Sequence, residues 1–173
     1  LIKRLSAVET LGCTTVICTA KTGTLTQNEM TVQSIWLPAL TNGQLNGRAI
    51  MISGIGYEPR GDLKENNTSI DVQRDTPLLR MLLTMARCNT AKIVAPDAEN
   101  PRWSVIGDPT EAALLVAAGK AGLSRETIQG EIVAELPFES RRKRMSIVQL
   151  ERTGQGFDRV VYTKGGIRET LDI

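Results

Sequence analysis

Two lysines and one aromatic residue have the spacing that best predicts a binding site. Residues 145–163 alternate like two β-strands joined by the turn Thr153-Gly154-Gln155-Gly156. Folding about this turn brings residues near 143 beside residues near 164, so we expect Lys143 and Lys164 to meet at the open end of the hairpin. Two ammonium groups in one small patch favour an anion, and Phe138 lies just upstream in LPFES. An aromatic face beside two lysines suits a base that carries phosphates.

The same three residues have a second interpretation. Phe138 can belong to the core, and the two lysines can be separately solvated on the surface. The residue pattern alone leaves both interpretations open. No GxxxxGK[ST] motif is present, so a P-loop is not the predicted route to a nucleotide.

Composition limits the class of protein. Of 173 residues, 41% are hydrophobic, which suffices for the core of one domain, or of one domain plus a fragment of another. The 21 Lys and Arg residues against 19 Asp and Glu leave a net charge of +2, too near balance for a general nucleic-acid or membrane-surface binder. Three cysteines without a CxxC pair, and no histidine, favour a reduced intracellular setting without zinc.

No apolar run approaches the roughly 20 residues that a membrane helix needs, so we expect a soluble chain. It begins with LIKRL and ends within what reads as the start of a helix. We therefore expect a fragment of a longer protein.

Period-two alternation and β-branched runs predict several strands. The expected strands are 14–18, 30–37, 131–136, 145–150 and 157–163, with GQLNGRAI as a further candidate. That candidate lies in residues 38–75, which show no sustained period.

Capping signals predict the helices. Thr76 is the expected N-cap of the first, with Pro77 at its first helical position, and Asp108 is the expected cap of the second. Glu111 stands where a capping box places its glutamate, so it has a structural interpretation of its own. The expected helices span 76–88, 108–119 and a short stretch at 124–129.

Several separated segments resemble the P-type cation-transporting ATPases of type II, the calcium and sodium/potassium branch. CTAKTGTLTQNEMTV resembles their phosphorylation loop, whose pattern is an aspartate followed by KTGTLT, and RLSAVETLGCTTVIC resembles the connection from the stalk. GDPTEAAL, PFESRRKRMS and YTKGG are similar to successive nucleotide-domain motifs, in the family's order. The resemblance implies an α+β fold, a largely antiparallel sheet flanked by helices. Residues 1–27 would be the stalk end and the first strand and loop of the phosphorylation domain, and 28–173 a nucleotide-binding domain, truncated or whole at its C-terminal end.

The resemblance also implies contacts with ATP or ADP. Phe138 would lie against adenine, Lys143 and Lys164 beside the nucleotide, and Glu111 near the adenine amino group. Gly165 would allow close approach of the backbone.

Three further positions follow from the same motifs. Ser140 matches the sodium-pump type of motif, and Arg142 is either a phosphate-side cation or a solvated surface residue. Gly166 stands where the family usually has alanine, a change that we expect to matter little sterically.

Ala20 is the main departure from the family. An aspartate at this position would attack the γ-phosphate and form an aspartyl phosphate, which a methyl group cannot do. Lys21 and Thr22 would position the phosphoryl group, and the Thr22 carbonyl would bind Mg²⁺ together with the missing carboxylate. We therefore expect weak magnesium binding and no catalysis from this chain.

The resemblance implies a parent protein that couples ATP hydrolysis to cation transport. The chain would be a cytoplasmic domain of a multi-pass membrane protein, with the remaining phosphorylation, actuator and transmembrane domains as partners. Two alternatives are a stand-alone, non-catalytic nucleotide sensor and a nucleic-acid or importin-binding module centred on the run from Arg141 to Arg144. That run lacks interleaved aromatic residues, so no nucleic-acid partner is expected.

Overall fold

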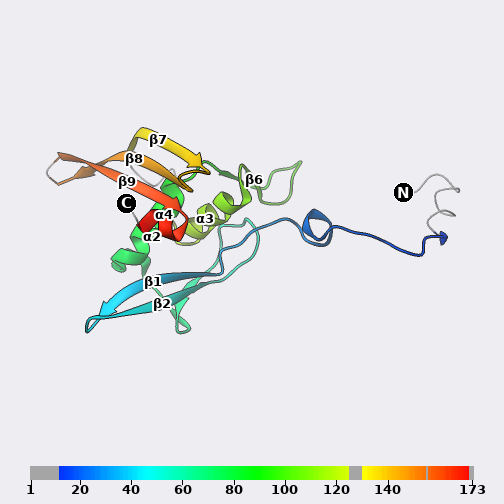
Figure 1. Cartoon of the computed structure of the whole chain (residues 1–173), viewed down its shortest axis with the longest axis horizontal. Coiled ribbons are helices and arrows are strands. Elements are labelled where there is room, and N and C mark those ends of the chain that lie inside the picture. The colour runs from blue at the N-terminus through cyan, green and yellow to red at the C-terminus, as the bar shows by residue number, and fades with distance from the viewer. Residues whose placement is uncertain (1–11, 125–129, 155, 172–173) are drawn as a thin grey trace.

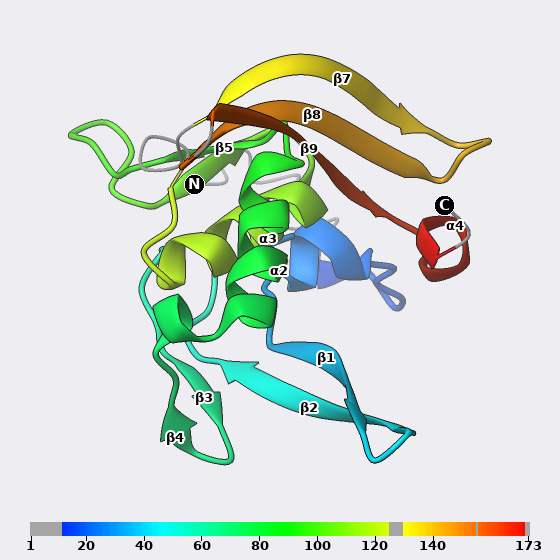
Figure 2. The same cartoon turned by 90° about the vertical axis from the view of Figure 1, so that its left-hand side faces the viewer.

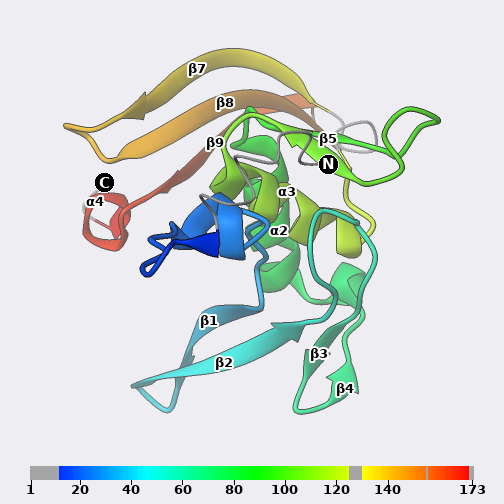
Figure 3. The ribbon, with the colours of Figure 1, turned by 90° about the vertical axis from the view of Figure 1, so that its right-hand side faces the viewer.

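Two helices form the centre of the fold. The computed structural model describes residues 12–124, 130–154 and 156–171. Helices α2 (Thr76–Arg87) and α3 (Pro109–Lys120) lie between two antiparallel sheets, one on each side of the helix layer (Figures 2 and 3). The remaining short helices are η1 (Lys21–Leu25), η2 (Val72–Arg74) and α4 (Ile167–Leu171).

The strands form three separate antiparallel sheets. The first contains β1 (Ser34–Thr41), β2 (Gln44–Ile52), β3 (Leu63–Glu65) and β4 (Thr68–Ser69), and the second contains β5 (Lys92–Val94) and β6 (Ser104–Ile106). The third contains β7 (Glu131–Glu139), β8 (Arg144–Thr153) and β9 (Gly156–Gly165). The prediction of an α+β fold with antiparallel strands and flanking helices is confirmed, with the strands divided among three sheets.

Apolar residues of the helices face both large sheets. Leu78 and Leu82 of α2 are fully buried against Ile50 and other residues of the first sheet. On the opposite side, Leu83 and Cys88 pack against the third sheet, around Met145, Ile147 and Tyr162. Helix α3 buries alanines, a leucine and a valine around most of its circumference, as expected for a helix inside a core.

Both long helices begin near their predicted positions. Asp108 caps α3 as predicted, accepting hydrogen bonds from the N–H groups of Thr110 and Glu111. The cap of α2 is Asp75 rather than Thr76, and it accepts a hydrogen bond from Leu78 N–H at 3.2 Å. The predicted short helix at 124–129 lies, apart from residue 124, outside the described residues.

The strand predictions are mostly confirmed after residue 43 and least accurate before it. The stretch GQLNGRAI lies almost entirely in β2, and the three predicted C-terminal strands are extended in β7, β8 and β9. The strand expected at 30–37 begins four residues later, as β1.

The strand predicted at 14–18 is wrong. These residues are exposed, and no described segment pairs with them. Figure 1 shows this part of the chain running away from the helices and sheets. A strand is stabilised by pairing with a neighbouring strand and by burial, whereas these exposed residues belong to none of the sheets that the described residues form.

Among the described residues, no helix has both the length and the apolar character needed to span a bilayer.

Asp75 connects α2 to the first sheet through a salt bridge. Its carboxylate contacts the Arg48 guanidinium of β2 at 2.5 Å, in addition to capping the helix.

We expect Asp75→Ala to lower the free energy of unfolding by about 2–3 kcal/mol, because both interactions are lost. Asp75→Asn keeps a capping oxygen and loses only the charge, so about 1 kcal/mol is expected. Urea unfolding measures both, and equal losses in the two variants would contradict this division.

Candidate functional site

A pocket of about 490 Å³ opens between the first turn of α3, β7 and the end of β9. It is lined by Asp108, Thr110, Glu111, Leu114, Phe138, Lys164 and Gly165. We call it the α3 pocket. Its volume is within the range of small-molecule sites. A larger pocket of about 760 Å³ at the start of α2 contains no aromatic residue, and its Arg48 and Asp75 already pair with each other.

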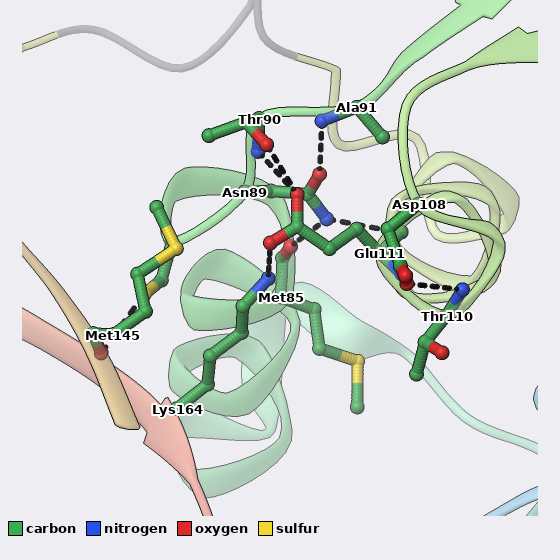
Figure 4. Close-up of polar contacts among 10 residues, drawn as sticks. Met85, Asn89, Thr90, Ala91, Asp108, Thr110, Glu111, Met145 and Lys164 are labelled. Carbon is green, nitrogen blue, oxygen red and sulfur yellow. Dashed lines mark hydrogen bonds and ion pairs between the residues drawn. The ribbon is translucent and has the colours of Figure 1, made fainter. Parts of the chain in front are cut away.

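An ion pair connects α3 to the third sheet at this pocket. Lys164 Nζ donates to Glu111 Oε1 at 2.7 Å. The other oxygen, Oε2, accepts from the backbone N–H and the hydroxyl of Thr90, each at 2.7 Å. Figure 4 shows the carboxylate held between these two groups, which come from different elements. A carboxylate has about four acceptor positions, so Oε1 retains one for a ligand.

The same contacts determine the charge of Glu111. Burial opposes ionisation of the carboxyl, but the hydrogen bonds from Lys164 and Thr90 outweigh burial and lower the pKa of Glu111 from 4.5 to about 2. Glu111 is therefore ionised at neutral pH and can only accept hydrogen bonds.

Asn89 fixes the backbone on which this arrangement depends. It is fully buried, and its side-chain amide donates to Glu111 O at 2.7 Å and to Met85 O at 3.1 Å. Its amide oxygen accepts from Ala91 N–H at 2.9 Å. Asn89 thereby joins the last turn of α2 to the first turn of α3 (Figure 4).

The capping-box interpretation of Glu111 is wrong. Asp108 caps the helix, but the Glu111 carboxylate is bonded to Thr90 and Lys164 instead of returning to the backbone of the cap. A charged ammonium is the stronger partner for a carboxylate than a neutral amide. Sequence spacing reveals the local partner only, since Lys164 is 53 residues away.

Phe138 is not a core residue. It lies on the edge strand β7 with 60% of its surface exposed, and its ring lines the α3 pocket. The alternative that placed it in the core is therefore wrong. An exposed aromatic face beside a pocket can stack on a planar ligand.

The two lysines do not share one patch. The register pairs Met145 with Lys164 and Arg144 with Gly165, so both lysines lie at the open end of the hairpin, as predicted. Lys164 Nζ contacts Glu111, whereas Lys143 Nζ contacts Glu169 at 3.1 Å. Lys143 has a φ of 49°, in the left-handed region, and it does not line the pocket. The sequence pattern could not show this local turn.

Ser140 and Arg142 lie outside the lining of the α3 pocket, and Ser140 is exposed. Arg142 folds back on its own turn, donating to Pro137 O at 2.8 Å and to Glu139 Oε2 at 3.2 Å. Its side chain is 29% exposed. Arg142 is therefore already neutralised by Glu139.

Gly165 lines the pocket, and its backbone also lies against the neighbouring strand. A Cβ atom there would lie 2.4 Å from Lys143 O. No side chain fits at this position without moving the backbone, so the hairpin itself requires glycine.

The loop at residues 20–22 lies away from α3 (Figure 1), and its residues do not line the α3 pocket. Lys21 and Thr22 are exposed, and the turn is closed by a hydrogen bond from Thr26 N–H to Lys21 O at 3.1 Å. Ala20 offers no carboxylate, and no group of three or more acidic, His or Cys side chains suited to a metal occurs among the described residues. The residues present do not fit the magnesium site expected at Thr22.

Two residues of the site were not predicted from the sequence, Asn89 and Thr90. Asn89 and Thr90 follow α2 directly and are polar, which is typical of an ordinary helix end. Their partner Glu111 is 21 residues further along the chain. Only the packing of α2 against α3 brings them together.

Comparison with known proteins identifies the family. A family model described as "P-type ATPase, cytoplasmic domain N" matches residues 77–172. Over 95% of its length the chain is 41% identical to a calcium-transporting ATPase of Bacillus subtilis, and over 99% it is 42% identical to a probable cation-transporting ATPase F of Mycobacterium tuberculosis. A calcium-transporting ATPase type 2C member 1 of Bos taurus is 34% identical over 99% of the chain.

The matches cover almost the whole chain but only part of each relative. The chain spans 16–18% of the length of these three curated relatives. The family model and the relatives agree, and the chain therefore belongs to the P-type ATPase family, with residues 77–172 corresponding to its cytoplasmic domain N.

Proposed function

We propose that this chain binds ATP and ADP in the α3 pocket, as the nucleotide-binding domain of a cation-transporting pump. The observation that carries the proposal is the exposed ring of Phe138 beside the ionised pair of Glu111 and Lys164. The similar proteins, which include calcium- and cation-transporting ATPases, support the proposal that the parent protein is a cation pump.

Each residue has a role that its geometry permits. The Phe138 ring stacks on adenine, and the unused acceptor position on Glu111 Oε1 takes a hydrogen bond from the exocyclic amino group. Lys164 has three donors, of which one is directed at Glu111, so others remain for the ligand. The proposal assigns Lys143, Ser140 and Arg142, which lie in the turn that follows β7, to the phosphates.

In the parent protein, the proposed reaction passes through an aspartyl phosphate at position 20 and drives cation transport across a membrane. The other phosphorylation, actuator and transmembrane segments of the parent are the proposed partners. Ala20 replaces the nucleophile here, so this chain binds nucleotide without transferring its phosphate.

Phe138→Ala tests the stacking role. We expect ATP to bind the unchanged chain with a dissociation constant of about 0.1–3 mM, as suits a half-exposed base and a few cations. The variant should weaken ATP, ADP and AMP by the same factor, about five- to tenfold, because stacking acts on the base. Calorimetry or NMR titration measures these constants.

Phe157→Ala, which removes a 71% exposed ring from the other end of β9, is the control and should bind normally. A loss that depends on the number of phosphates contradicts the assignment.

The proposed role of Glu111 requires an ionised carboxylate, which its lowered pKa supplies. A carboxyl group whose pKa is lower in the folded than in the unfolded protein stabilises the fold at pH values above its unfolded pKa. This stabilisation is lost as the pH falls through the folded-state pKa. We expect Glu111→Gln to cost about 1–3 kcal/mol of unfolding free energy at pH 7. This difference from the unchanged chain should shrink as pH falls from 4.5 towards 2. Urea unfolding at several pH values measures it, with the exposed Glu131→Gln as a control for loss of one charge. A difference in unfolding free energy that grows as the pH falls would contradict a stabilising ion pair between Glu111 and Lys164.

Ala20→Asp tests whether the nucleophile alone restores chemistry. We expect no acid-stable, hydroxylamine-sensitive phosphoenzyme from labelled ATP, because phosphoryl transfer also needs a divalent cation and fixed cations around the transferring oxygens. The exposed Lys21 loop provides no such arrangement. ATP binding should be unchanged, since the α3 pocket is elsewhere. Stoichiometric phosphoenzyme would show that a complete active site is present.

A further inference from the structure

Lys143 is held at the edge of the α3 pocket by backbone hydrogen bonds. Its N–H donates to Glu139 O at 2.7 Å, and its carbonyl accepts from Gly166 N–H at 2.9 Å. Its carbonyl also borders Gly165, which lines the pocket. The backbone of Lys143 is therefore fixed, while its side chain is 63% exposed and free to change partner.

The present partner of Lys143 is Glu169 of α4. Lys143 Nζ lies 3.1 Å from Glu169 Oε1. A hydrogen bond from the residue's own backbone N–H, together with that from Lys143, holds the pKa of Glu169 below its ordinary value. Arg144 donates to the backbone carbonyl of Glu169, which keeps this residue beside the hairpin.

Gly166 makes room for this carboxylate. A Cβ atom at Gly166 would lie 2.3 Å from Glu169 Oε2, a contact that only movement of the carboxylate could relieve. The backbone at Gly166 is not in the left-handed region, so alanine is conformationally allowed there. The expectation that alanine matters little sterically at this position stays a prediction, because the close contact is with the end of a flexible side chain rather than with the backbone. That side chain is nevertheless the partner of Lys143, so alanine would move it.

The two ion pairs at the site differ in exposure. The side chains of Lys164 and Glu111 are 21% and 15% exposed, and Glu111 has additional bonds to Thr90. Those of Lys143 and Glu169 are 63% and 31% exposed. An exposed ion pair contributes little net free energy, so a competing anion can replace its carboxylate.

We propose that Glu169 is the counter-ion of Lys143 in the empty site and that the phosphate chain of a bound nucleotide displaces it. Glu169 then weakens the binding of triphosphates more than that of monophosphates, because the longer, more highly charged chain reaches the lysine and meets the carboxylate there. This inference rests on the proposed nucleotide binding at the α3 pocket. It makes Glu169 and Gly166 residues that set the preference for phosphate number.

The test compares four proteins by titration with ATP and with AMP at low salt. The variants are Glu169→Gln, which removes the counter-ion, and Gly166→Ala, which displaces it without a change of charge. Glu131→Gln at the opposite end of the third sheet is the control for the loss of one negative charge. We expect Glu169→Gln and Gly166→Ala to bind ATP about two- to fivefold more tightly and AMP within about 1.5-fold of the unchanged chain. Glu131→Gln should leave the ratio of the two affinities unchanged.

A double variant shows whether Lys143 carries the effect. In a Lys143→Gln background, Glu169→Gln should no longer change ATP affinity, because the partner it releases is absent. Equal ATP affinity in all four proteins overturns the role of Glu169, and so does a gain that is the same for AMP or that survives without Lys143. If neither nucleotide binds any of the proteins, the proposed function itself is wrong, and this inference is wrong with it.

Discussion

The site depends on one requirement, that the side chain of Asn89, buried where α2 meets α3, is hydrogen-bonded. Asn89 is fully buried at this junction and can be accommodated only because its amide bonds to carbonyls of both helices and to Ala91 N–H. This fixes Thr90 beside Glu111, and Glu111 in turn holds Lys164 of β9. The positions of these residues in the pocket wall therefore follow from the need to pair buried polar atoms. Leaving the amide or the carboxylate unpaired here would cost more free energy than the hydrogen bonds contribute when they form.

The elements that were predicted correctly are those in which local chemistry and tertiary packing agree. The strands from β7 to β9 alternate with period two. A glycine turn joins β8 to β9, and the pairing of Thr153 with Gly156 follows directly. Helix α3 begins at an Asp-Pro signal that needs no distant partner. Where a distant group takes part, the sequence is less informative. Asp75 caps α2 while also binding Arg48, and that second contact is invisible from its neighbours.

The errors at the site have the same cause. The partners of Glu111, Lys143 and Lys164 are decided by side-chain directions that a hairpin register does not determine. Lys143 occupies a left-handed turn and reaches Glu169, so proximity at the open end of the hairpin does not put two ammonium groups together. The strand expected at 14–18 failed for the opposite reason, because its β-branched sequence has no pairing partner among the described residues. Propensity alone does not make a strand.

Lys164 in the α3 pocket and Lys143 beside it each already pair with a carboxylate, and this limits what charge can contribute. A phosphate that binds Lys143 forms a new ion pair but breaks the pair of Lys143 with Glu169. Only the difference in free energy between these two ion pairs contributes to the affinity. Stacking on the exposed Phe138 ring has no such competitor within the pocket and is available to any nucleotide. Under the proposed nucleotide binding, electrostatics at this site would select among nucleotides, and the aromatic face would supply most of the affinity. The proposed binding would then be weak and exchangeable, because neither contribution requires the pocket to close around its ligand.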